Sequence, residues 1–450
     1  MKILILSHVS DYVGGAERSI LDVLDEWKLK NPNIEVYFVL RKPLGSYIVK
    51  MKEKGYKYQA VDFTYWSDSN LPNTDERKFT HTLRNMRAVK KIESIIDDFK
   101  PDFILTNSIV APWAALAAYY KGVPHVWFAR EYGDLDHGRK FEIGRENTWR
   151  DIGLMSEVVL TNSESLSKHV AQYIEKNKII TVYNPFDLKA IVKQSKEKSV
   201  SPFNYKDSLK LILTSGGIAP SKGQREAVEA IGLLTEKGYN VEIALVGRPG
   251  SAEFMEELST LSLKYGVKKR IHLTGYTSNP LSFATHADVG LMASRMEAFG
   301  RVTFEYQAIG LPVVGANSGA TPEIINDSTS GFLYEPGNSR DMADKIEKYL
   351  LDRTIVELHQ KNASKQAVGL MKKNSANDAF EKITKSIGEF NPPPRMNYAH
   401  HFMDYPEIAQ KYYANIGNAS LYSIISIKLK NRLRPHYKNI RSVYARITGK

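Results

Sequence analysis

The sequence contains no cysteine among its 450 residues. A chain without thiols forms no disulfide framework, no thiolate metal site and no cysteine nucleophile, and it suits a reducing cytoplasm. It also lacks a run of about eighteen apolar residues, so no membrane-spanning helix is expected. The apolar start, Ile3–Leu6, is too short for a signal peptide and is soon followed by Asp11 and Glu17. We therefore interpret it as a buried strand.

Acidic residues are absent from residues 409–450, which carry nine lysines and arginines. The net charge is +12, from 62 basic and 50 acidic residues, so the remainder of the chain nets only +3. Hydrophobic residues make up 42% and charged residues 25%, the balance of a globular enzyme. Because single cores stop growing near about 250 residues, this length predicts at least two domains.

Short β-rich runs alternate with helical patterns in the first part of the chain, which is typical of βαβ units around a parallel sheet. The expected strands are Ile3–Ser7, Val36–Leu40, Phe103–Thr106, Val126–Ala129, Val158–Thr161 and Ile180–Val182. The expected helices are Ala16–Trp27, Phe79–Phe99, Ala111–Lys121 and Glu164–Tyr173. A polar stretch, Lys189–Asp207, then indicates a linker.

The same rhythm restarts after the linker and predicts a second doubly wound domain. Its expected strands are Lys210–Thr214, Glu242–Val246, Ile271–Leu273, Val289–Met292, Pro312–Val314 and Phe332–Tyr334, and its expected helices are Gln224–Glu236, Ala252–Tyr265, Asp341–Leu350 and Ala376–Ile387. The prolines 392–394 exclude a helix and mark a boundary. We therefore predict domains over 1–190 and 205–375, a crossover helix with the proline-rich boundary over 376–395, and a basic tail over 396–450.

Three segments that follow predicted strands have the composition of anion sites. Gly14-Gly15 opens the first helix, and Gly216-Gly217 leads to Lys222 at the entrance of a later one. Glycines let a ligand approach the backbone, helix N-termini offer free amides to anions, and a lysine neutralises a diphosphate. Taken singly, the glycine pair Gly14-Gly15 is equally explained as a tight turn, and Lys222 is better explained as a solvated lysine.

The third segment, Ser294–Glu305, has two glutamates eight residues apart around a Gly300-Arg301 junction where a helix should begin. Glu297 would accept hydrogen bonds from two sugar hydroxyls, and Glu305 would hold those of a ribose. The amides between them would face a pyrophosphate. The alternative is that Glu297 only caps the helix and that Glu305 is a surface residue.

This segment resembles the E-x7-E motif of glycosyltransferase family 4. The surrounding motifs are similar too, and they extend the resemblance over about residues 1–390: Lys222-Gly223, Leu245–Gly247, His272–Tyr276, Gly310–Val314, Thr321–Ile325 and Gly331-Phe332. The resemblance implies a GT-B fold of two facing Rossmann-like domains, with donor in the second, acceptor against the first, and a C-terminal helix that returns to the first.

The resemblance also implies a retaining transferase that needs no metal ion or cofactor, because a lysine and a helix N-terminus stabilise the leaving diphosphate. A donor phosphate oxygen would take the acceptor's proton during same-face attack. The implied catalytic residues are Glu297 and Lys222, with Arg130 and Glu131 as first-domain candidates. The implied donor-binding residues are Gly14, Gly15, Gly217, Lys222, Arg248, Tyr276, Glu297, Phe299, Gly300, Arg301, Val302 and Glu305.

Two positions depart from the family pattern. Members carry an arginine five residues before the motif lysine, where this chain has Gly217, so Arg248, Arg295 and Arg301 are candidate replacements. Members also place a histidine after a first-domain strand near the transferred sugar. Here Arg130-Glu131 follow that strand, while His125 precedes it and His137 lies far along the loop. Asp134-Leu135-Asp136 matches a metal-binding D-x-D pattern, but we interpret it as a polar loop.

We therefore expect a hexose transfer from a nucleotide diphosphate sugar, most simply a UDP-sugar, to a glycan or lipid-linked acceptor in surface polysaccharide or cell-wall assembly. Apolar residues at helical spacing among the basic residues of 417–450 fit an anionic membrane surface, or equally the packing of the tail on protein. No nucleic-acid module is visible. The competing hypotheses are a non-catalytic GT-B scaffold subunit, a phosphorylase and a sugar-nucleotide epimerase.

Overall fold

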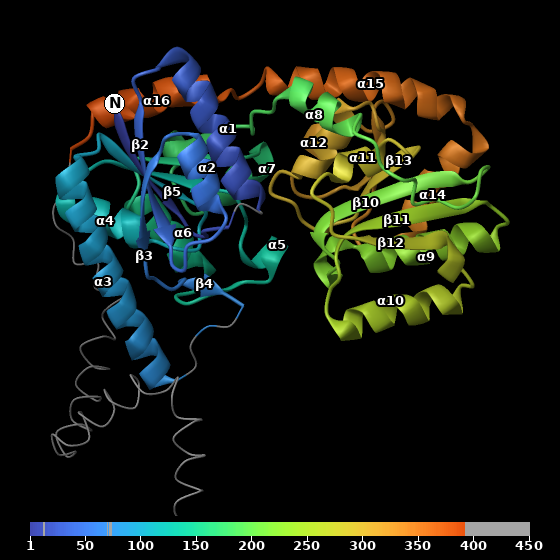
Figure 1. Ribbon diagram of the computed structural model, residues 1–450, viewed down its shortest axis with the longest axis horizontal. Helices are drawn as coiled ribbons and strands as arrows, with labels where there is room; N and C mark the ends of the chain where they lie inside the picture. Colours follow the sequence, from blue (N-terminus) through green and yellow to red (C-terminus); the bar gives the residue numbers. More distant parts are fainter. Residues whose placement is uncertain (12–13, 70, 72–73, 392–450) are drawn as a thin grey trace, which may run out of the picture. The chain divides into compact units, whose positions relative to one another are not determined.

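The computed structural model describes residues 1–11, 14–69, 71 and 74–391, and these contain two parallel sheets (Figure 1). The first sheet has seven strands in the order β3-β2-β1-β5-β6-β8-β9. Their bounds are β1 Lys2–Ser7, β2 Glu35–Arg41, β3 Lys57–Val61, β5 Phe103–Asn107, β6 His125–Ala129, β8 Val158–Thr161 and β9 Ile179–Thr181. A small antiparallel pair, β4 Ser67–Asp68 with β7 Lys140–Phe141, lies outside this sheet.

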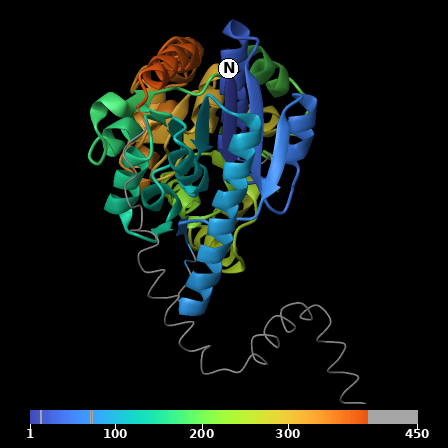
Figure 2. The same ribbon diagram turned by 90° about the vertical axis from the view of Figure 1, so that its left-hand side faces the viewer.

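Helices cover the first sheet because its strands are apolar on both faces. Ile3 and Ile5 of β1 pack with α1, α2 and α16, while the alternate residues Leu4 and Leu6 are equally buried. The helices along this part are α1 Gly15–Lys30, α2 Tyr47–Glu53, α3 Asp75–Phe99, α4 Trp113–Lys121, α5 Asp134–His137, α6 Arg145–Leu154, α7 Glu164–Val170 and α8 Leu188–Ser195. The 25-residue α3 is seen along its length in Figure 2.

The second sheet has six parallel strands in the order β12-β11-β10-β13-β14-β15. They are β10 Leu209–Gly217, β11 Val241–Arg248, β12 Ile271–Gly275, β13 Val289–Met292, β14 Val313–Ala316 and β15 Gly331–Tyr334. The helices are α9 Gln224–Glu236, α10 Ala252–Lys264, α11 Pro280–Ala284, α12 Arg301–Ala308, α13 Thr321–Ile324, α14 Ser339–Leu351, α15 Thr354–Met371 and α16 Ala376–Gly388. We call the β1–β9 sheet with α1–α7 the first domain, and the β10–β15 sheet with α9–α15 the second domain.

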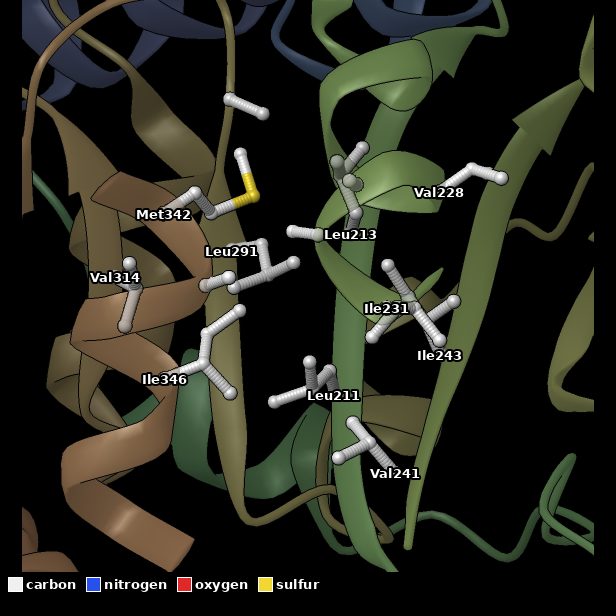
Figure 3. Packing of buried hydrophobic residues seen from close by; sticks show 14 of the residues in the cluster. Leu211, Leu213, Val228, Ile231, Val241, Ile243, Leu291, Val314, Met342 and Ile346 are labelled. Carbon is white, nitrogen blue, oxygen red and sulfur yellow. The ribbon is translucent and has the colours of Figure 1, made fainter. Parts of the chain in front are cut away.

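The core of the second domain shows why the alternation of its strands matters. Leu211 and Leu213 of β10 project to one face, where Ile231 of α9 and Ile346 of α14 meet them (Figure 3). The intervening Ile212 projects to the other face and packs with residues of α11 and α12. Both faces are therefore filled, as the apolar runs predicted, and the two doubly wound Rossmann-like domains are confirmed.

The helix α16 leaves the second domain and packs on α1 of the first. The Trp27 indole of α1 donates a 2.7 Å hydrogen bond to the carbonyl of Ala376. Its ring also lies 4.9 Å from that of Phe380. The chain thus returns to the first sheet after building the second.

The strand orders create one switch point in each sheet. β1 lies between β2 and β5, and β10 lies between β11 and β13, so consecutive connections diverge at these strands. Ligands of open α/β sheets bind at the carboxyl ends of such strands. The structure therefore directs attention to the segments after β1, β5, β10 and β13.

Several boundary expectations are wrong. The predicted linker Lys189–Asp207 contains most of α8, because Asp187 caps the helix by accepting from the Ala190 amide. Gly216-Gly217 end β10 instead of forming a turn, since Gly217 still pairs with Arg248 after a register shift that follows Thr214.

Two expectations in the first domain are also wrong. The helix expected over Glu164–Tyr173 ends at Val170 as α7, and the polar loop expected at Asp134–Asp136 is the short helix α5. Asp136 stabilises the start of α5 because its carboxylate accepts from the amides of Tyr132 and Gly133.

The chain separates into two units, residues 1–71 with 88–393 and residues 72–87 with 394–450. The proline-rich boundary at 392–394 and the predicted basic tail lie outside the described residues. No helix within the described ranges is long and apolar enough to cross a membrane.

Candidate active site

A cavity of about 420 Å³ lies between strand ends of the two domains of the first unit. Its lining includes residues that follow both switch-point strands, such as His8 after β1 and Lys222 after β10. Ten of the residues predicted from the sequence line it: Gly14, Gly15, Arg130, Glu131, Lys222, Glu297, Phe299, Gly300, Arg301 and Val302. Segments far apart in sequence thus meet at one site.

Lys222 and Glu297 form an ion pair of 2.7 Å within this cavity, although 75 residues separate them. They meet because they follow β10 and β13, which are neighbours in the sheet. Gly223 permits the approach, since its φ is +72° and an added Cβ would lie 2.1 Å from the carbonyl oxygen of Ala293. A side chain at position 223 would therefore displace the lysine loop from the glutamate loop.

The Lys222 ammonium keeps Glu297 ionised in a partly buried position. Burial opposes ionisation, but Lys222, with help from Ser294, holds the pKa of Glu297 below its ordinary value. About a fifth of each side chain stays exposed, so both can reach a ligand in the cavity. A carboxylate that accepts hydrogen bonds and an ammonium group thus lie side by side. This arrangement suits a sugar attached to a phosphate, because the carboxylate can bind the sugar hydroxyls and the ammonium can bind the phosphate.

The N-terminus of α12 forms the next part of the wall. Gly300 takes the left-handed conformation, with φ +81°, and the helix begins at Arg301, as predicted. The Arg301 guanidinium, however, is already engaged with the first domain. It donates to Ser19 at 2.8 Å and to Asp22 at 3.0 Å, and it stacks over the Phe186 ring.

Glu305, the second glutamate of the motif, lies deeper along α12 and is not among the cavity residues. Burial raises its pKa, and Arg301, whose Nε lies 3.9 Å away, lowers it. Phe299 lines the cavity, but its ring packs with Tyr183 and Phe186.

Three predicted donor-binding residues gather elsewhere, at the ends of β10, β11 and β12. Gly217 pairs with Arg248, whose guanidinium stacks 4.8 Å from the ring centre of Tyr276. The Tyr276 side chain is 61% exposed. An exposed planar stack is suited to an aromatic ring, so this cluster is a second candidate contact and is separate from the cavity.

The first-domain wall holds a buried pair that the sequence analysis did not identify. Glu17, in the first turn of α1, is 2% exposed, and its Oε1 lies 3.7 Å from Nδ1 of His8. Within the described residues neither atom has a hydrogen-bond partner. Gly14 leaves room for this carboxyl, because a Cβ there would lie 2.3 Å from Oε2 of Glu17 and would displace it.

Burial dominates the ionisation of this pair. It raises the pKa of Glu17 to about 7, the amides of Glu17 and Gly14 lower it, and the Glu131 charge raises it further. Burial together with Arg139 lowers the pKa of His8 to about 3. Burial therefore favours the neutral form of both the His8 imidazole and the Glu17 carboxyl.

Arg130 and Glu131 occupy the end of β6, as their position after a strand predicted. The Arg130 guanidinium donates to Asn107 at 2.9 Å and to Asn184 at 2.8 Å. The Glu131 carboxylate accepts from the Ser108 hydroxyl and, at 2.9 Å, from the Ile109 amide. Both side chains are 7% exposed.

The positions of the histidines relative to the cavity differ in part from those expected. His137, placed far along the loop by the sequence reading, lies in α5 and lines the cavity. His125, at the start of β6, is buried with hydrogen bonds to Thr106 and Ser156, and burial lowers its pKa to about 3. His8, Asn162 and Asn184 also line the cavity; all three come soon after strands, which was the available signal.

Across the described ranges, no cluster of three or more His, Cys, Asp or Glu side chains has the spacing of a metal site. Whether the reaction needs a metal ion stays a prediction of the sequence analysis.

Comparison with known families gives two matches along the chain. The family described as Glycosyltransferase Family 4 matches residues 13–190, and Glycosyl transferases group 1 matches residues 195–367. Together they cover all the residues that line the cavity except His8, which follows β1 and precedes the first match.

Individual relatives agree with these matches. Over 152 residues, the chain is 31% identical to the capsular polysaccharide biosynthesis glycosyltransferase CapM of Staphylococcus aureus, covering 34% of this chain and 39% of CapM. It is 27% identical over 206 residues to N-acetyl-alpha-D-glucosaminyl L-malate synthase of Bacillus anthracis, covering 46% and 52%. The chain therefore matches about half or less of the length of these relatives.

Among solved structures, HepE of Anabaena in complex with UDP has a TM-score of 0.65 and 18% identity, with 87% of this chain and 100% of HepE covered. At this identity the likeness shows the fold alone. The two family matches, the two parallel sheets and the motif residues after β10 and β13 agree, and the chain belongs to glycosyltransferase family 4, with the GT-B fold.

Proposed function

We propose that this protein is a retaining, metal-independent transferase that moves a hexose-type sugar from a nucleotide diphosphate sugar to a glycan or lipid-linked acceptor. The observation that carries the proposal is the Lys222–Glu297 ion pair of 2.7 Å at the α12 end of the cavity. UDP-sugar is the proposed donor, which the UDP complex of HepE supports by analogy of fold.

The chemistry follows from charge. When the sugar–phosphate bond breaks, negative charge develops on the leaving diphosphate, and preorganised cations and amides stabilise it best in a site shielded from water. Lys222 and the α12 amides would supply that stabilisation. Glu297 would accept hydrogen bonds from the sugar hydroxyls and orient the ring. A donor phosphate oxygen would take the proton of the attacking acceptor hydroxyl, so no protein nucleophile is needed.

The acceptor would enter against the first-domain wall, where polar groups such as Glu17 and Asn162 line the cavity. CapM is named for capsular polysaccharide biosynthesis, and a role in surface polysaccharide or cell-wall glycan assembly is proposed on that likeness. The proposed location is the cytoplasm, at the inner face of the membrane if the basic tail binds anionic lipid.

The decisive experiment is nucleoside diphosphate release by purified protein from UDP-, GDP-, ADP- and dTDP-sugars, with chelator and with or without anionic liposomes. We expect release from one donor, retained in chelator and abolished in Glu297→Ala. Glu305→Gln should weaken donor binding, while Glu256→Gln, an exposed change on α10, should not. Release that disappears with chelator would contradict metal independence.

Two observations favour a second candidate, a non-catalytic scaffold subunit. Position 217 is a glycine where the family has an arginine, and the Arg301 guanidinium, although the residue lines the cavity, is engaged with Asp22. A scaffold would bind no nucleoside diphosphate and release none, which the same panel measures.

A further inference from the structure

Arg130 is a buried cation whose hydrogen-bond partners are all neutral. Its Nε and Nη1 donate to the side-chain oxygens of Asn107 and Asn184, and its guanidinium lies 3.3 Å from the centre of the Phe128 ring. Only 7% of the residue is exposed. These contacts hold the guanidinium in one position without giving it an ion-pair partner.

Nearby carboxylates, those of Glu131, Glu17 and Asp22, act on Arg130 only from beyond ion-pair distance. In the part of the chain that the structure describes, no ion pair within 4.0 Å involves Arg130. Glu131 directs its carboxylate to Ser108 and Ile109, and Glu17 is buried against His8. Burial of a charge without an ion-pair partner is unfavourable, and a bound anion would relieve it.

The third nitrogen of the Arg130 guanidinium, Nη2, is not used by the described part of the protein. It is buried and has no hydrogen-bond partner among the described residues, and Arg130 lines the cavity that also holds Lys222. A guanidinium with two nitrogens fixed by amides and the third unused is a preorganised donor for an anionic oxygen.

The other cations near the cavity are already committed. Lys222 pairs with Glu297, and Arg301 pairs with Asp22. The remaining candidates to replace the arginine missing at Gly217 are Arg295, which pairs with Glu226, and Arg248, which stacks on Tyr276. Arg139 also lines the cavity and, among the described residues, has no acidic partner and leaves Nε buried without a hydrogen bond. Its guanidinium donates to the Ser67 carbonyl, and the residue is more exposed than Arg130.

We propose that Arg130 binds an anionic oxygen of the substrate, and that this oxygen belongs to the donor diphosphate. On this proposal, which rests on the function proposed above, the first domain supplies the cationic contact that Gly217 cannot make. An acidic group on the acceptor is the other source of the same chemistry, and the experiment separates the two.

The first test compares the affinity of Arg130→Gln and the parent protein for nucleotide pairs: UDP with UMP, GDP with GMP, and ADP with AMP. We expect the preferred diphosphate to bind 10- to 100-fold more weakly in the variant, while its monophosphate changes less than about threefold. Arg130→Lys should fall between. Arg145→Gln, which removes an arginine paired with Asp134 outside the cavity, is the matched control.

Unchanged diphosphate affinity in folded Arg130→Gln would overturn the assignment. If acceptor glycosylation were then lost while slow donor hydrolysis persisted, the anion would belong to the acceptor. If the parent bound no nucleotide, the proposed function would fail, and calorimetry with inorganic pyrophosphate would test Arg130 by itself. Equal pyrophosphate binding by parent and variant, or none by either, would then overturn the anion site.

A second variant keeps Arg130 in place and neutralises it. Asn184→Asp puts a carboxylate where the guanidinium now has a neutral partner at 2.8 Å. We expect an equal or higher melting temperature together with a 5- to 30-fold weaker diphosphate affinity. A purely structural role for Arg130 predicts the gain in stability without the loss of affinity.

Complementation provides the last readout. Among the described residues, a Cβ at Gly217 would meet just the Arg248 carbonyl oxygen, at an ordinary contact distance of 3.8 Å, so a side chain can start there without a backbone clash. Gly217→Arg in the Arg130→Gln background should recover at least a third of the lost diphosphate affinity on a logarithmic scale. No recovery would mean that the two positions do not serve the same anion.

Discussion

The two walls of the cavity handle charge in opposite ways. On the second-domain wall, Lys222 and Glu297 already pair with each other at 2.7 Å. On the first-domain wall, His8, Glu17 and Arg130 each leave a buried polar atom without a partner among the described residues. The second-domain wall thus has its charges paired before a ligand arrives, whereas the first-domain wall needs a ligand to supply partners for its buried polar atoms.

The largest effect should come from breaking the ion pair on the second-domain wall. Lys222→Met removes the cation that faces the leaving group and leaves Glu297 without its partner, so turnover should fall about a thousandfold. Steady-state release of nucleoside diphosphate measures it. Lys237→Met, which removes an exposed lysine paired with Glu347, should leave turnover unchanged. A loss below tenfold would mean that the pair is not the catalytic centre.

On the first-domain wall, the stability contributed by Glu17 should depend on pH. Because burial raises the folded-state pKa of Glu17 to about 7 from an ordinary 4.5, ionisation destabilises the fold as pH rises through this window. The free energy of unfolding of Glu17→Gln should therefore exceed that of the parent protein by about 3 kcal/mol at pH 8. At pH 5 the two free energies should agree within about 1 kcal/mol.

Urea unfolding at the two pH values measures this difference. Glu146→Gln, an exposed change on α6, should show no pH-dependent gain. An equal effect of Glu17→Gln at both pH values would show that the Glu17 carboxyl is not strained by burial.

A smaller effect should come from hydrogen-bond donors at the start of α7 whose acceptor is a carboxylate of the second domain. Glu323 of α13 accepts from the amides of Glu164 and Ser165 at the start of α7, at 2.9 and 2.6 Å, and from the Tyr183 hydroxyl at 2.8 Å. Glu323→Gln should cost about 1 to 2 kcal/mol of unfolding free energy, because a neutral amide accepts these bonds more weakly. Chemical denaturation beside Glu256→Gln checks it, and equal stability of the two would contradict it.

The smallest effect is expected outside the cavity. Tyr276→Ala removes the stack on Arg248, and it should weaken binding of the preferred nucleoside diphosphate only two- to fivefold. Leu273→Ala, which removes an exposed side chain of β12, is the control. A loss above about fiftyfold would move the main donor contact from the cavity to the ends of β10–β12.

Sequence patterns predicted the architecture well because buried parallel strands are short continuous apolar runs. They also located Lys222 and Glu297, since both follow strands and lie beside glycines that a ligand or a close loop requires. They failed where the outcome depends on contacts distant in sequence. No local sequence pattern shows that Arg301 engages Asp22, 279 residues away. None shows that the buried Glu17 lies beside His8 on the first-domain side of the cavity.

Boundary errors have a local cause. The lysine- and serine-rich composition of 189–207 favours a loop, but the Asp187 cap and the packing of Ile191 with Phe186 stabilise α8 there. Likewise, glycines suggested a turn at 216–217, although β11 supplies a pairing partner that extends β10.

The packing of α16 on α1 has a consequence for how the chain is made. The helix α16 packs on the first domain but follows the second domain in sequence, so the ribosome synthesises the second domain before the helix that covers the α1 face emerges. Until then the Trp27 indole lacks its acceptor at Ala376, and apolar residues of α1 lack Phe380 and Ile383. The nascent first domain is therefore an incomplete folding unit whose final assembly follows that of its neighbour.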